Sequence, residues 1–383
     1  MTLGKEVKVF RSVDGIGRDA INSIADDAFF TYDWFKTLET QKSFPVSPFY
    51  LAVYDDDRLI AFTSCFLDLS DAYFYVGPRL RYAMPFLKNM LNFGRQHGFC
   101  QEHILLCYSP YSVRSRILQK NNREEKLVFS LLANKIDAIC KKERVLFSSF
   151  LFVSEFNEFL MENLQNFSYL KSPGITTFYL DVCWSSFEDY LKSLKKKTAQ
   201  NVRREMKRCA ESGVTIEEKE ISSLSAKDFS DLSHNNNLKY DKNARNIFDP
   251  SFFNRLNEFA GEKTVLFVAK KNNEVVGFCL VLRQGDVADV WMPGFRYDDL
   301  TNTDFTYFNV VYYAPIQWAI REGIRKMYFR NKAERVKLSR GCKPEETFSF
   351  VKCHDGILGP VINGALRTPF CSFLSRRLPR RSW

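Results

Sequence analysis

The feature that most restricts the fold is a run of three predicted strands, a long helix and one further strand in the second half of the chain. Apolar residues alternate along the three strands, which we predict at 264–270, 275–282 and 288–296. Helical spacing follows at 304–322, and another strand pattern at 326–330. A meander that continues through a helix into a further strand predicts a mixed α/β fold in which helices pack on a sheet.

The first half of the chain repeats this gross order, which predicts a second copy of the same architecture. Its predicted strands are 8–12, 48–54, 59–66, 103–108, 145–153 and 176–182, and its predicted helices are 19–27, 33–42, 85–94, 126–139 and 155–166. The second half opens with a predicted helix at 187–212, a strand at 214–221 and helices at 226–238 and 250–259. A length of 383 residues also favours two domains. We predict them at 1–170 and 171–383, with the junction at Ser172-Pro173-Gly174.

Composition argues against several other classes of protein. We expect no membrane span, because no run approaches ~18 uncharged apolar residues, and the N-terminus lacks the apolar core of a signal peptide. The 10 cysteines form no CxxC pair and are typical of reduced thiols, so we expect a cytoplasmic protein. The 4 histidines are scattered, and we expect no metal site.

The net charge of +10 is concentrated in three segments, 192–208, 325–343 and the tail 376–381. Two interpretations remain open. The charge could bind an anionic ligand, such as the pyrophosphate of coenzyme A or a tRNA backbone, or it could be a basic surface without a specific partner.

Several motifs in the second half resemble those of one family. They are 184–191 (WSSFEDYL), 195–197 (KKK), 201–205 (NVRRE), 309–313 (NVVYY), 319–323 (AIREG) and 337–344 (KLSRGCKP) with Thr347. These motifs resemble the FemAB-related, GCN5-type acyltransferases, which include the BioF2-like acetyltransferase domain. Weaker similarity lies in the first half at 29–39 and 109–118. The chain departs from these relatives at 331–336, where they often carry glycines and a histidine.

The resemblance implies two tandem GCN5-related acyltransferase (GNAT) domains, of which the second carries the chemistry and the first supports it. It implies an N-acyltransferase that moves an acyl group from an acyl-CoA-type donor to a small-molecule amine acceptor. An aminoacyl-tRNA-dependent transferase that forms an amide or peptide bond remains an alternative, as does a non-catalytic binding module of the same fold. The donor, acyl-CoA or aminoacyl-tRNA, would be a co-substrate, and no permanently bound cofactor is expected.

In this family the donor lies between two strands that splay apart, and its phosphates rest on the N-terminus of the helix that joins them. The corresponding strands here are 288–296 and 326–330, and Thr303 is predicted to cap the helix between them. Three aspartates within 298–304 concentrate negative charge at the start of that helix. This charge would repel an anion bound there.

Amine acylation needs a base for the attacking ammonium and a proton donor for the carbonyl oxygen or the leaving group. We predict Asp289 as the base. The predicted proton donor is Tyr312, Tyr328 or Tyr313, with packing as the alternative role of each. The predicted donor-binding residues are Lys337, Arg340, Gly341, Arg203, Arg204 and Thr303. The predicted acceptor-binding residues are Trp291, His234, Lys239, Tyr240 and Arg330.

The basic residues have structural alternatives. Lys337 and Arg340 fit a solvated basic turn as well as a site for donor phosphates. The basic residues of 195–208 share one helix face by the 3.6-residue periodicity, and such a face is either a solvated surface or a contact with a phosphate backbone. If Lys337 and Arg340 bind the donor, replacing either by alanine weakens donor binding without unfolding the protein.

Overall fold

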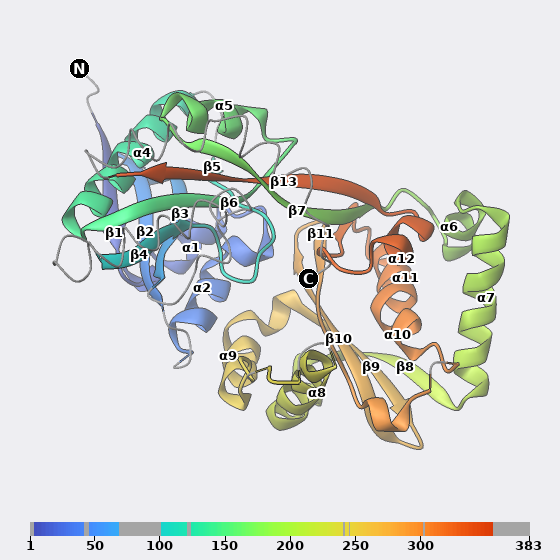
Figure 1. Cartoon of the computed structure of the whole chain (residues 1–383). Coiled ribbons are helices and arrows are strands. Elements are labelled where there is room, and N and C mark those ends of the chain that lie inside the picture. The colour runs from blue at the N-terminus through green and yellow to red at the C-terminus, as the bar shows by residue number, and fades with distance from the viewer. Residues whose placement is uncertain are drawn as a thin grey trace. The chain divides into compact units, whose positions relative to one another are not determined.

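Figure 1 shows the protein as a computed structural model. The structure describes residues 4–41, 46–68, 101–120, 124–239, 242–244, 246–301 and 303–354. The predicted helix at 85–94, the basic tail at 376–381 and Tyr240 lie outside these residues. The chain packs as two compact units. The first is drawn from Met1–Ala25, Phe44–Thr176 and Glu345–Trp383, and the second from Asp26–Ser43 and Thr177–Pro344.

The first unit is a sheet with helices packed against it. Its strands, in spatial order, are β1 (Lys5–Phe10), β2 (Val46–Asp55), β3 (Arg58–Asp68), β4 (Gln101–Cys107), β6 (Val145–Ser154) and β13 (Lys343–Cys353). Neighbours run antiparallel except β4 and β6, and the short β5 (Leu118–Gln119) pairs with β3. The helices are α1 (Arg18–Asn22), α4 (Glu125–Lys142) and α5 (Glu158–Asn166). The apolar face of α4, with Leu132 and Ile136, packs into a core that includes Phe150 and Phe350.

The second unit is a sheet with helices on both faces. Its strands, in spatial order, are β7 (Leu170–Asp181, of which 177–181 belong to this unit), β12 (Lys326–Tyr328), β11 (Val287–Phe295), β10 (Glu274–Gln284), β9 (Thr264–Lys271) and β8 (Val214–Glu220). The pair β11 and β12 is parallel, and the other pairs are antiparallel.

Two groups of helices cover this second sheet (Figure 1). What we call the α11 face is covered by α6 (Phe187–Ser193), α7 (Lys196–Glu211), α10 (Thr306–Phe308), the π-helical turn η8 (Asn309–Tyr313), α11 (Ala314–Arg321) and α12 (Glu334–Ser339). What we call the α8 face is covered by α2 (Tyr32–Glu39), α8 (Ala226–Leu238) and α9 (Pro250–Ala260). Short 3₁₀ turns lie at Val13–Gly15, Ala28–Phe30, Ile221–Ser223, Gly261–Lys263 and Tyr297–Asp299.

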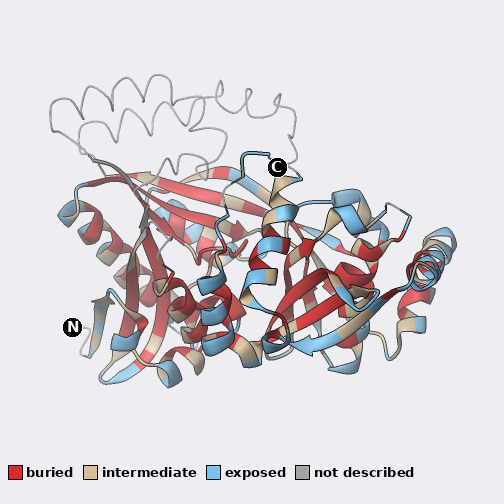
Figure 2. Ribbon diagram, turned by 90° about the horizontal axis from the view of Figure 1, so that it is seen from below, coloured by how far each residue is buried: buried red, intermediate tan, exposed pale blue. Residues whose placement is uncertain are grey.

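The two units share one order of elements. Each has four antiparallel strands, then a helical crossover, then a strand parallel to the fourth: β1 to β4, α4 and β6 in the first unit, and β8 to β11, α10 to α11 and β12 in the second. The central strands of both sheets are largely buried, the edge strands β1 and β8 are not, and α7, at the right edge of Figure 2, exposes its outer side. The predicted mixed α/β architecture and its internal repetition are therefore confirmed.

Some element boundaries differ from prediction. Ser172-Pro173-Gly174, the predicted junction, lies inside β7. The helix predicted at 187–212 is two helices, because Leu194 between α6 and α7 is extended, with φ −82° and ψ 159°. Packing also assigns Asp26–Ser43 to the second unit and Glu345–Trp383 to the first, so the boundaries 1–170 and 171–383 stay a prediction. Within the described ranges, no helix is both long and apolar enough to cross a bilayer.

Candidate functional site

Strands β11 and β12 run side by side for only part of their length. Their parallel register covers 287–289 and 326–328 and ends at the pair Asp289 and Tyr328, whereas β11 continues to Phe295. The two strands therefore part after Asp289, and we call this place the fork.

The chain beyond β12 leaves β11 and stays bonded to β7. The amide of Phe329 donates to the carbonyl of Phe178 over 2.7 Å, and the amide of Phe178 donates to the carbonyl of Arg330 over 3.1 Å. Arg330 has a positive φ of 53°, which few residues other than glycine adopt. One side of the fork is thus β11, and the other is Phe329 and Arg330 backed by β7. The splayed arrangement predicted for these two strands is present.

A β-bulge lies in β11 at the fork. The register with β10 passes from Leu280 and Met292 to Val281 and Val290, so Trp291 is the extra residue. A bulge leaves one residue out of the regular ladder, and bulges are frequent beside active sites. The bulge therefore interrupts the β10–β11 ladder close to the place where β12 leaves β11.

Asp289 and Tyr328 lie together on the α8 face of the sheet. They are direct partners in the β11–β12 register, so their side chains point to the same side. Both are buried, and Tyr328 is in turn the partner of Tyr179 on β7, with ring centroids 6.2 Å apart. The predicted base and one predicted proton donor are therefore neighbours at the closed end of the fork.

The side chain of Trp291 is enclosed by other aromatic rings and is only 5% exposed. Its ring centroid lies 5.2 Å from that of Trp34, 5.8 Å from Phe248, 6.0 Å from Phe252 and 6.1 Å from Phe29. The ring packs β11 against α2 and α9. An acceptor-binding role for this side chain stays a prediction, and its geometry favours packing.

The end of α8 carries two further predicted acceptor residues. α8 approaches β11 so closely at Gly294 that a Cβ atom there would lie 2.8 Å from the main chain of Leu232. His234 is half-buried, and its buried Nδ1 has no hydrogen-bond partner among the described residues. Lys239 is exposed, with its Nζ 4.1 Å from the centroid of the Tyr297 ring. These polar groups lie on α8, the helix that covers β11 beyond the bulge.

The helix after β11 begins later than predicted, and Thr303 does not cap it. α10 starts at Thr306, and Phe305 occupies the N-cap position with a φ of 51°. Thr303 is exposed, and its hydroxyl is 2.9 Å from that of Thr301. The predicted cap is wrong because these threonines form a separate turn before the helix. A donor-binding role for Thr303 stays a prediction.

Asp304 places a negative charge beside this helix start. Its carboxylate accepts from the amide of Thr301 over 3.1 Å and pairs with Lys271 over 3.3 Å. Burial by itself raises the pKa of Asp304, but the hydrogen bonds from Thr301 and the charge of Lys271 lower it overall. The ionised carboxylate opposes a phosphate at the first helical turn, as expected from the aspartates of 298–304.

Tyr312 lies in the π-helical turn, a feature that often marks functional sites. Its ring stacks on Phe329 with centroids 5.3 Å apart and an angle of 9° between the planes. Burial, with a contribution from Tyr307, raises the pKa of Tyr312. The ring thus contacts the β12 side of the fork, while its hydroxyl is a weaker acid than an ordinary tyrosine.

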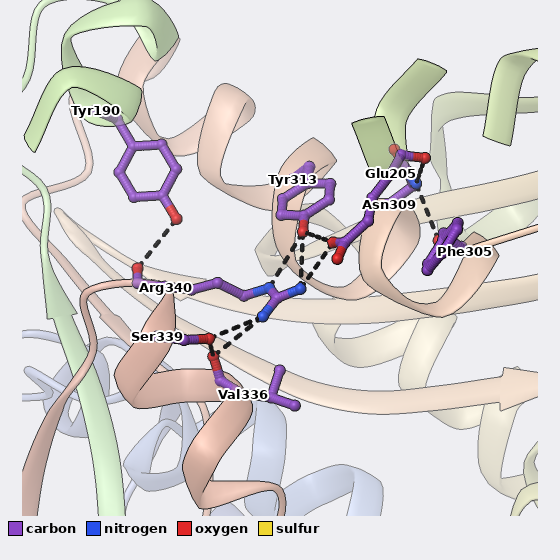
Figure 3. A network of polar contacts seen from close by, with 8 residues as sticks. All are labelled: Tyr190, Glu205, Phe305, Asn309, Tyr313, Val336, Ser339 and Arg340. Carbon is purple, nitrogen blue, oxygen red and sulfur yellow. Dashed lines mark hydrogen bonds and ion pairs between the residues drawn. The ribbon is translucent and has the colours of Figure 1, made fainter. Parts of the chain in front are cut away.

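Arg340 is the centre of a buried polar network (Figure 3). Its Nη2 lies 2.8 Å from a carboxylate oxygen of Glu205 and 2.9 Å from the hydroxyl of Tyr313. Its Nη1 donates to the hydroxyl of Ser339 over 3.0 Å and to the carbonyl of Val336 over 3.4 Å. The side chains of Arg340 and Glu205 are 8% and 10% exposed. The guanidinium therefore finds its partners inside the protein.

The network joins helices that are distant in the sequence. Glu205 belongs to α7, and the hydroxyl of Tyr313 in the π-helical turn donates to its carboxylate. Asn309 donates from its amide to the carbonyl of Glu205 over 3.3 Å, and Tyr190 of α6 donates to the carbonyl of Arg340 over 3.0 Å. These contacts hold α6, α7, the π-helical turn and α12 together. Donor binding by Arg340 stays a prediction, and the contacts favour a positioning role.

Lys337 lies one turn before Arg340 on α12 and is 4% exposed. Its Nζ donates to the carbonyl of Arg330 over 3.1 Å and lies 5.0 Å from the ring centroid of Phe178. Burial lowers the pKa of Lys337 to about 7, an effect that Cys342 opposes and Arg330 reinforces. A lysine amine that is partly uncharged at neutral pH therefore lies where β7 pairs with the segment that follows β12.

The remaining predicted donor-binding residues lie apart from this amine. Gly341 follows α12 with a φ of +85°, and a Cβ atom there would lie 3.3 Å from Leu194, so a larger residue would be strained. Arg203 and Arg204 are exposed on the solvent side of α7, opposite the buried Glu205, and Arg203 pairs with Glu188 at 2.5 Å. Their roles stay predictions.

Glu205 was not identified from the sequence, although a signal was available. The buried residues of α7 are Ala199, Val202, Glu205 and Cys209, which recur at helical spacing. A carboxylate in this buried row, among exposed lysines and arginines, indicates a buried partner of opposite charge.

The site residues fall into two sets on opposite faces of one sheet. Asp289 and Tyr328 lie on the α8 face, whereas Tyr312, Lys337 and Arg340 lie on the α11 face. Among the described residues, no three His, Cys, Asp or Glu side chains are grouped so as to hold a metal ion.

The family model named FemAB-like, described as peptidoglycan biosynthesis/recognition, matches residues 11–368. No curated protein matches the chain. Among solved structures, FemX is 12% identical, with a TM-score of 0.61 over 93% of this chain and 100% of FemX. A tandem GNAT protein from the clavulanic acid biosynthesis pathway is 10% identical, with a TM-score of 0.51 over 92% of this chain and 99% of its own. A conserved protein of unknown function from Bacteroides thetaiotaomicron is 11% identical, with a TM-score of 0.54 over 90% and 99%.

These structures share the fold of this chain and show that it consists of two GNAT-like domains, as predicted. Family and fold together support an acyl- or aminoacyl-transferase in general. Because the family model covers almost the whole chain, this protein belongs to the FemAB-like family.

Proposed function

We propose that this protein is an N-acyltransferase that passes an acyl group from an acyl-CoA-type donor to a small-molecule amine acceptor, with both substrates meeting at the fork. The observation that carries the proposal is the parting of β11 from β12 after Asp289 and Tyr328, with a bulge at Trp291 in the adjoining β10–β11 ladder. The extended arm of coenzyme A contains amide groups, which can form hydrogen bonds to the free edge of β11 as an added strand would.

The two faces of the sheet support a division of labour. We assign the acceptor amine to the α8 face, because Asp289 points to that face and α8, which carries His234, covers β11 there. Positive charge for the donor belongs on the other side, and Lys337 and the basic α7 lie on the α11 face. In this arrangement the donor enters from the α11 face and the acyl carbon meets the amine within the fork.

A second candidate is an aminoacyl-tRNA-dependent transferase that forms an amide or peptide bond. The observation that favours it is the outer side of α7, where Lys195, Lys196, Lys197, Arg204 and Arg208 are all exposed. Such a row suits a phosphate backbone better than the few phosphates of coenzyme A. We prefer the acyl-CoA donor because the free edge of β11 at the fork is sufficient to bind its extended arm.

The experiment that tests the proposal measures the unfolding temperature of the whole chain with acetyl-CoA, a long-chain acyl-CoA, free coenzyme A or aminoacyl-tRNA. A true ligand stabilises by about 2.7 kcal/mol at 100 times its dissociation constant. Stabilisation by an acyl-CoA, followed by release of thiol when an amine is added, supports the first candidate. Stabilisation by aminoacyl-tRNA alone supports the second. If none of these donors stabilises the protein, the transferase proposal is wrong.

A further inference from the structure

We infer that the first unit contains a second fork, that the protein's own chain occupies it, and that one donor molecule therefore binds per chain, at the fork between β11 and β12. The observation that carries this inference is one buried residue, Ser115, which is bonded to both β4 and β6 where these strands part. The inference rests on the proposed function, because that function assigns the donor to such a place.

The strands β4 and β6 repeat the geometry of the fork. They are parallel, and their register ends at the pair Cys107 and Phe150. β4 ends at Cys107, whereas β6 continues to Ser154. In the order of elements these strands correspond to β11 and β12. We call the place where they part the first-unit fork.

Beyond this place, β5 resumes the path of β4. β2 pairs along one edge of β3, so β4 and β5 both lie on the other edge, with Cys107 opposite Cys65 and Leu118 opposite Phe62. Residues 108–117 connect the two strands, and we call them the inserted loop. The ends of the inserted loop are fixed to β3, because the hydroxyls of Ser64 and Thr63 donate to the carbonyls of residues 108 and 116 over 2.9 and 3.1 Å.

Ser115 carries the inserted loop across the first-unit fork. Its hydroxyl donates to the carbonyl of Cys107, the last residue of β4, over 2.9 Å. Its amide donates to the carbonyl of Phe152 on β6 over 3.0 Å. A residue bonded to both strands just beyond their last pair lies between them. The main-chain bonds that an extended ligand would form in this place are therefore formed by the protein itself.

β6 is shaped to receive this contact. Its register with β13 shifts between Phe348 and Phe350, where β6 has one residue more than β13. Phe152, in this bulge, has a φ of 58°, which few residues other than glycine adopt. A bulge redirects backbone groups locally, and here the carbonyl of Phe152 bonds to Ser115.

The inserted loop is a packed part of the first unit. None of its residues is exposed, and Ser109, Ser112 and Arg114 are buried. The amide of Ser112 donates to the carbonyl of Ser109 over 3.1 Å, and its hydroxyl donates to the carbonyl of Arg114 over 3.0 Å. A donor could enter the first-unit fork only by displacing this buried structure.

The chain that follows β11 takes a different course. The amide of Arg296 donates to the carbonyl of Val276 on β10 over 2.9 Å. The next main-chain bonds join Asp299 to Arg296 and Leu300 to Tyr297. In its described part this connection thus bonds back to β10 and forms local turns, whereas Ser115 crosses the first-unit fork.

The first test counts donor molecules and locates them on the whole chain. Acetyl-CoA and aminoacyl-tRNA are titrated separately in a calorimeter, and hydrogen exchange is followed by mass spectrometry with and without each probe. We expect one molecule to bind per chain. Amides of 290–296 in β11 should exchange about tenfold more slowly or less with the bound probe. Amides of 108–117 and 150–154 should exchange at the same rate with and without it.

The second test examines the inserted loop without a ligand. The amide of Ser115 should exchange slowly in the free wild type, because it is buried and bonded to Phe152. Ser115→Ala removes the bond to Cys107 and should speed exchange of 108–117 by about threefold to tenfold, the effect of one lost hydrogen bond. The matched control is Ser130→Ala, whose lost hydroxyl bond lies within α4, and it should leave this exchange unchanged.

The contrary outcomes can be told apart. Two molecules per chain, or slower exchange of 108–117 or 150–154 with a bound probe, would place a donor in the first-unit fork and overturn the inference while the proposed function stands. Exchange of 108–117 at the rate of an unfolded peptide in the free wild type would also overturn it. If neither probe binds, the proposed function and the single donor site are both wrong.

Discussion

Two buried cations three residues apart, Lys337 in α12 and Arg340 directly after it, have opposite surroundings. Arg340 faces the carboxylate of Glu205, which with Tyr313 raises its pKa, although burial alone would lower it. Lys337 faces a carbonyl, a ring and another cation, and its pKa falls to about 7. At the scale of single residues, the same motif thus supplies one permanently charged structural group and one group that can exchange a proton near neutral pH.

The first prediction concerns Arg340. Replacing it by alanine leaves the carboxylate of Glu205 buried without its partner, which costs about 3–5 kcal/mol of the free energy of unfolding. This expectation replaces the sequence-based one that Arg340→Ala would keep the protein folded. Urea denaturation measures the loss, and Arg335→Ala, on the exposed side of α12, should stay within about 0.5 kcal/mol of the wild type. A wild-type midpoint for Arg340→Ala would show that the pair is not needed for stability.

The second prediction concerns His354 in the first unit. Its Nε2 lies 2.8 Å from the hydroxyl of Ser148, which also contacts the hydroxyl of Tyr169, and its Nδ1 lies 3.7 Å from Asp137. Burial lowers the pKa of His354 to about 4, an effect that Asp137 opposes and Lys352 reinforces. The folded state therefore contains His354 as a neutral imidazole.

Between pH 6.5 and about 4 the unfolded chain binds a proton that the folded His354 does not, so stability should fall as pH falls through this range. The ceiling of the effect is about 3 kcal/mol, at 1.36 kcal/mol for each pH unit. Denaturation of the wild type and of His354→Gln at pH 7 and pH 4.5 measures it. An equal decline in both proteins would assign the acid sensitivity to other groups.

At the scale of elements, α7 combines a structural side and a basic side. Its buried row contains Glu205, while Lys196, Gln200, Arg203, Arg204, Lys207 and Arg208 are exposed, as the helical periodicity predicted. Ion pairs engage two of these, Arg203 with Glu188 and Lys207 with Glu211. In the described part of the chain Lys196, Arg204 and Arg208 form no ion pair, so they remain available for an anionic partner.

The third prediction separates the two donors through α7. If tRNA binds this helix, replacing Lys196, Arg204 and Arg208 together by alanine should reduce the slope of log affinity against log salt by about two to three, at ~0.9 for each phosphate contact. A salt titration of tRNA binding measures the slope. The matched control replaces Lys141, Lys142 and Lys126 of α4 in the first unit. Parallel lines for wild type and α7 variant would remove the tRNA candidate.

At the scale of the whole molecule, each unit depends on a segment from the other half of the sequence. β13 belongs mostly to the first unit, where Phe350 and Val351 are buried and its residues pair with β6. The segment Asp26–Ser43, with the buried Trp34 and Phe35 of α2, belongs to the second unit. Neither half of the chain therefore contains all the strands and helices of one unit.

The fourth prediction follows from this exchange. A fragment of residues 1–176 should not unfold cooperatively, because the edge of β6 and the apolar surface covered by Phe350 are left exposed. The same fragment joined through a flexible linker to 345–383 should regain a cooperative transition. Calorimetry distinguishes the two. A cooperative transition in the bare fragment would show that β13 is dispensable.

The sequence by itself determined the local elements and the side to which many residues point. Alternation and helical spacing depend only on neighbouring residues, so the meander β9 to β11, α8 and the exposed row of α7 could be predicted. The resemblance of 337–344 added the fold and the family. These signals also placed Asp289 and Tyr328 on one face of adjacent strands, as the register shows.

Only the tertiary structure decided which residues from distant segments contact each other. Glu205 and Arg340 are 135 positions apart, and Thr347 of β13 pairs with Ser154 of β6. The pKa of Lys337 depends on burial under Phe178 and Arg330, which no local pattern records. Desolvation and charge pairing act through distance in space, so the roles of these groups could be read only after the helices had packed on the sheet.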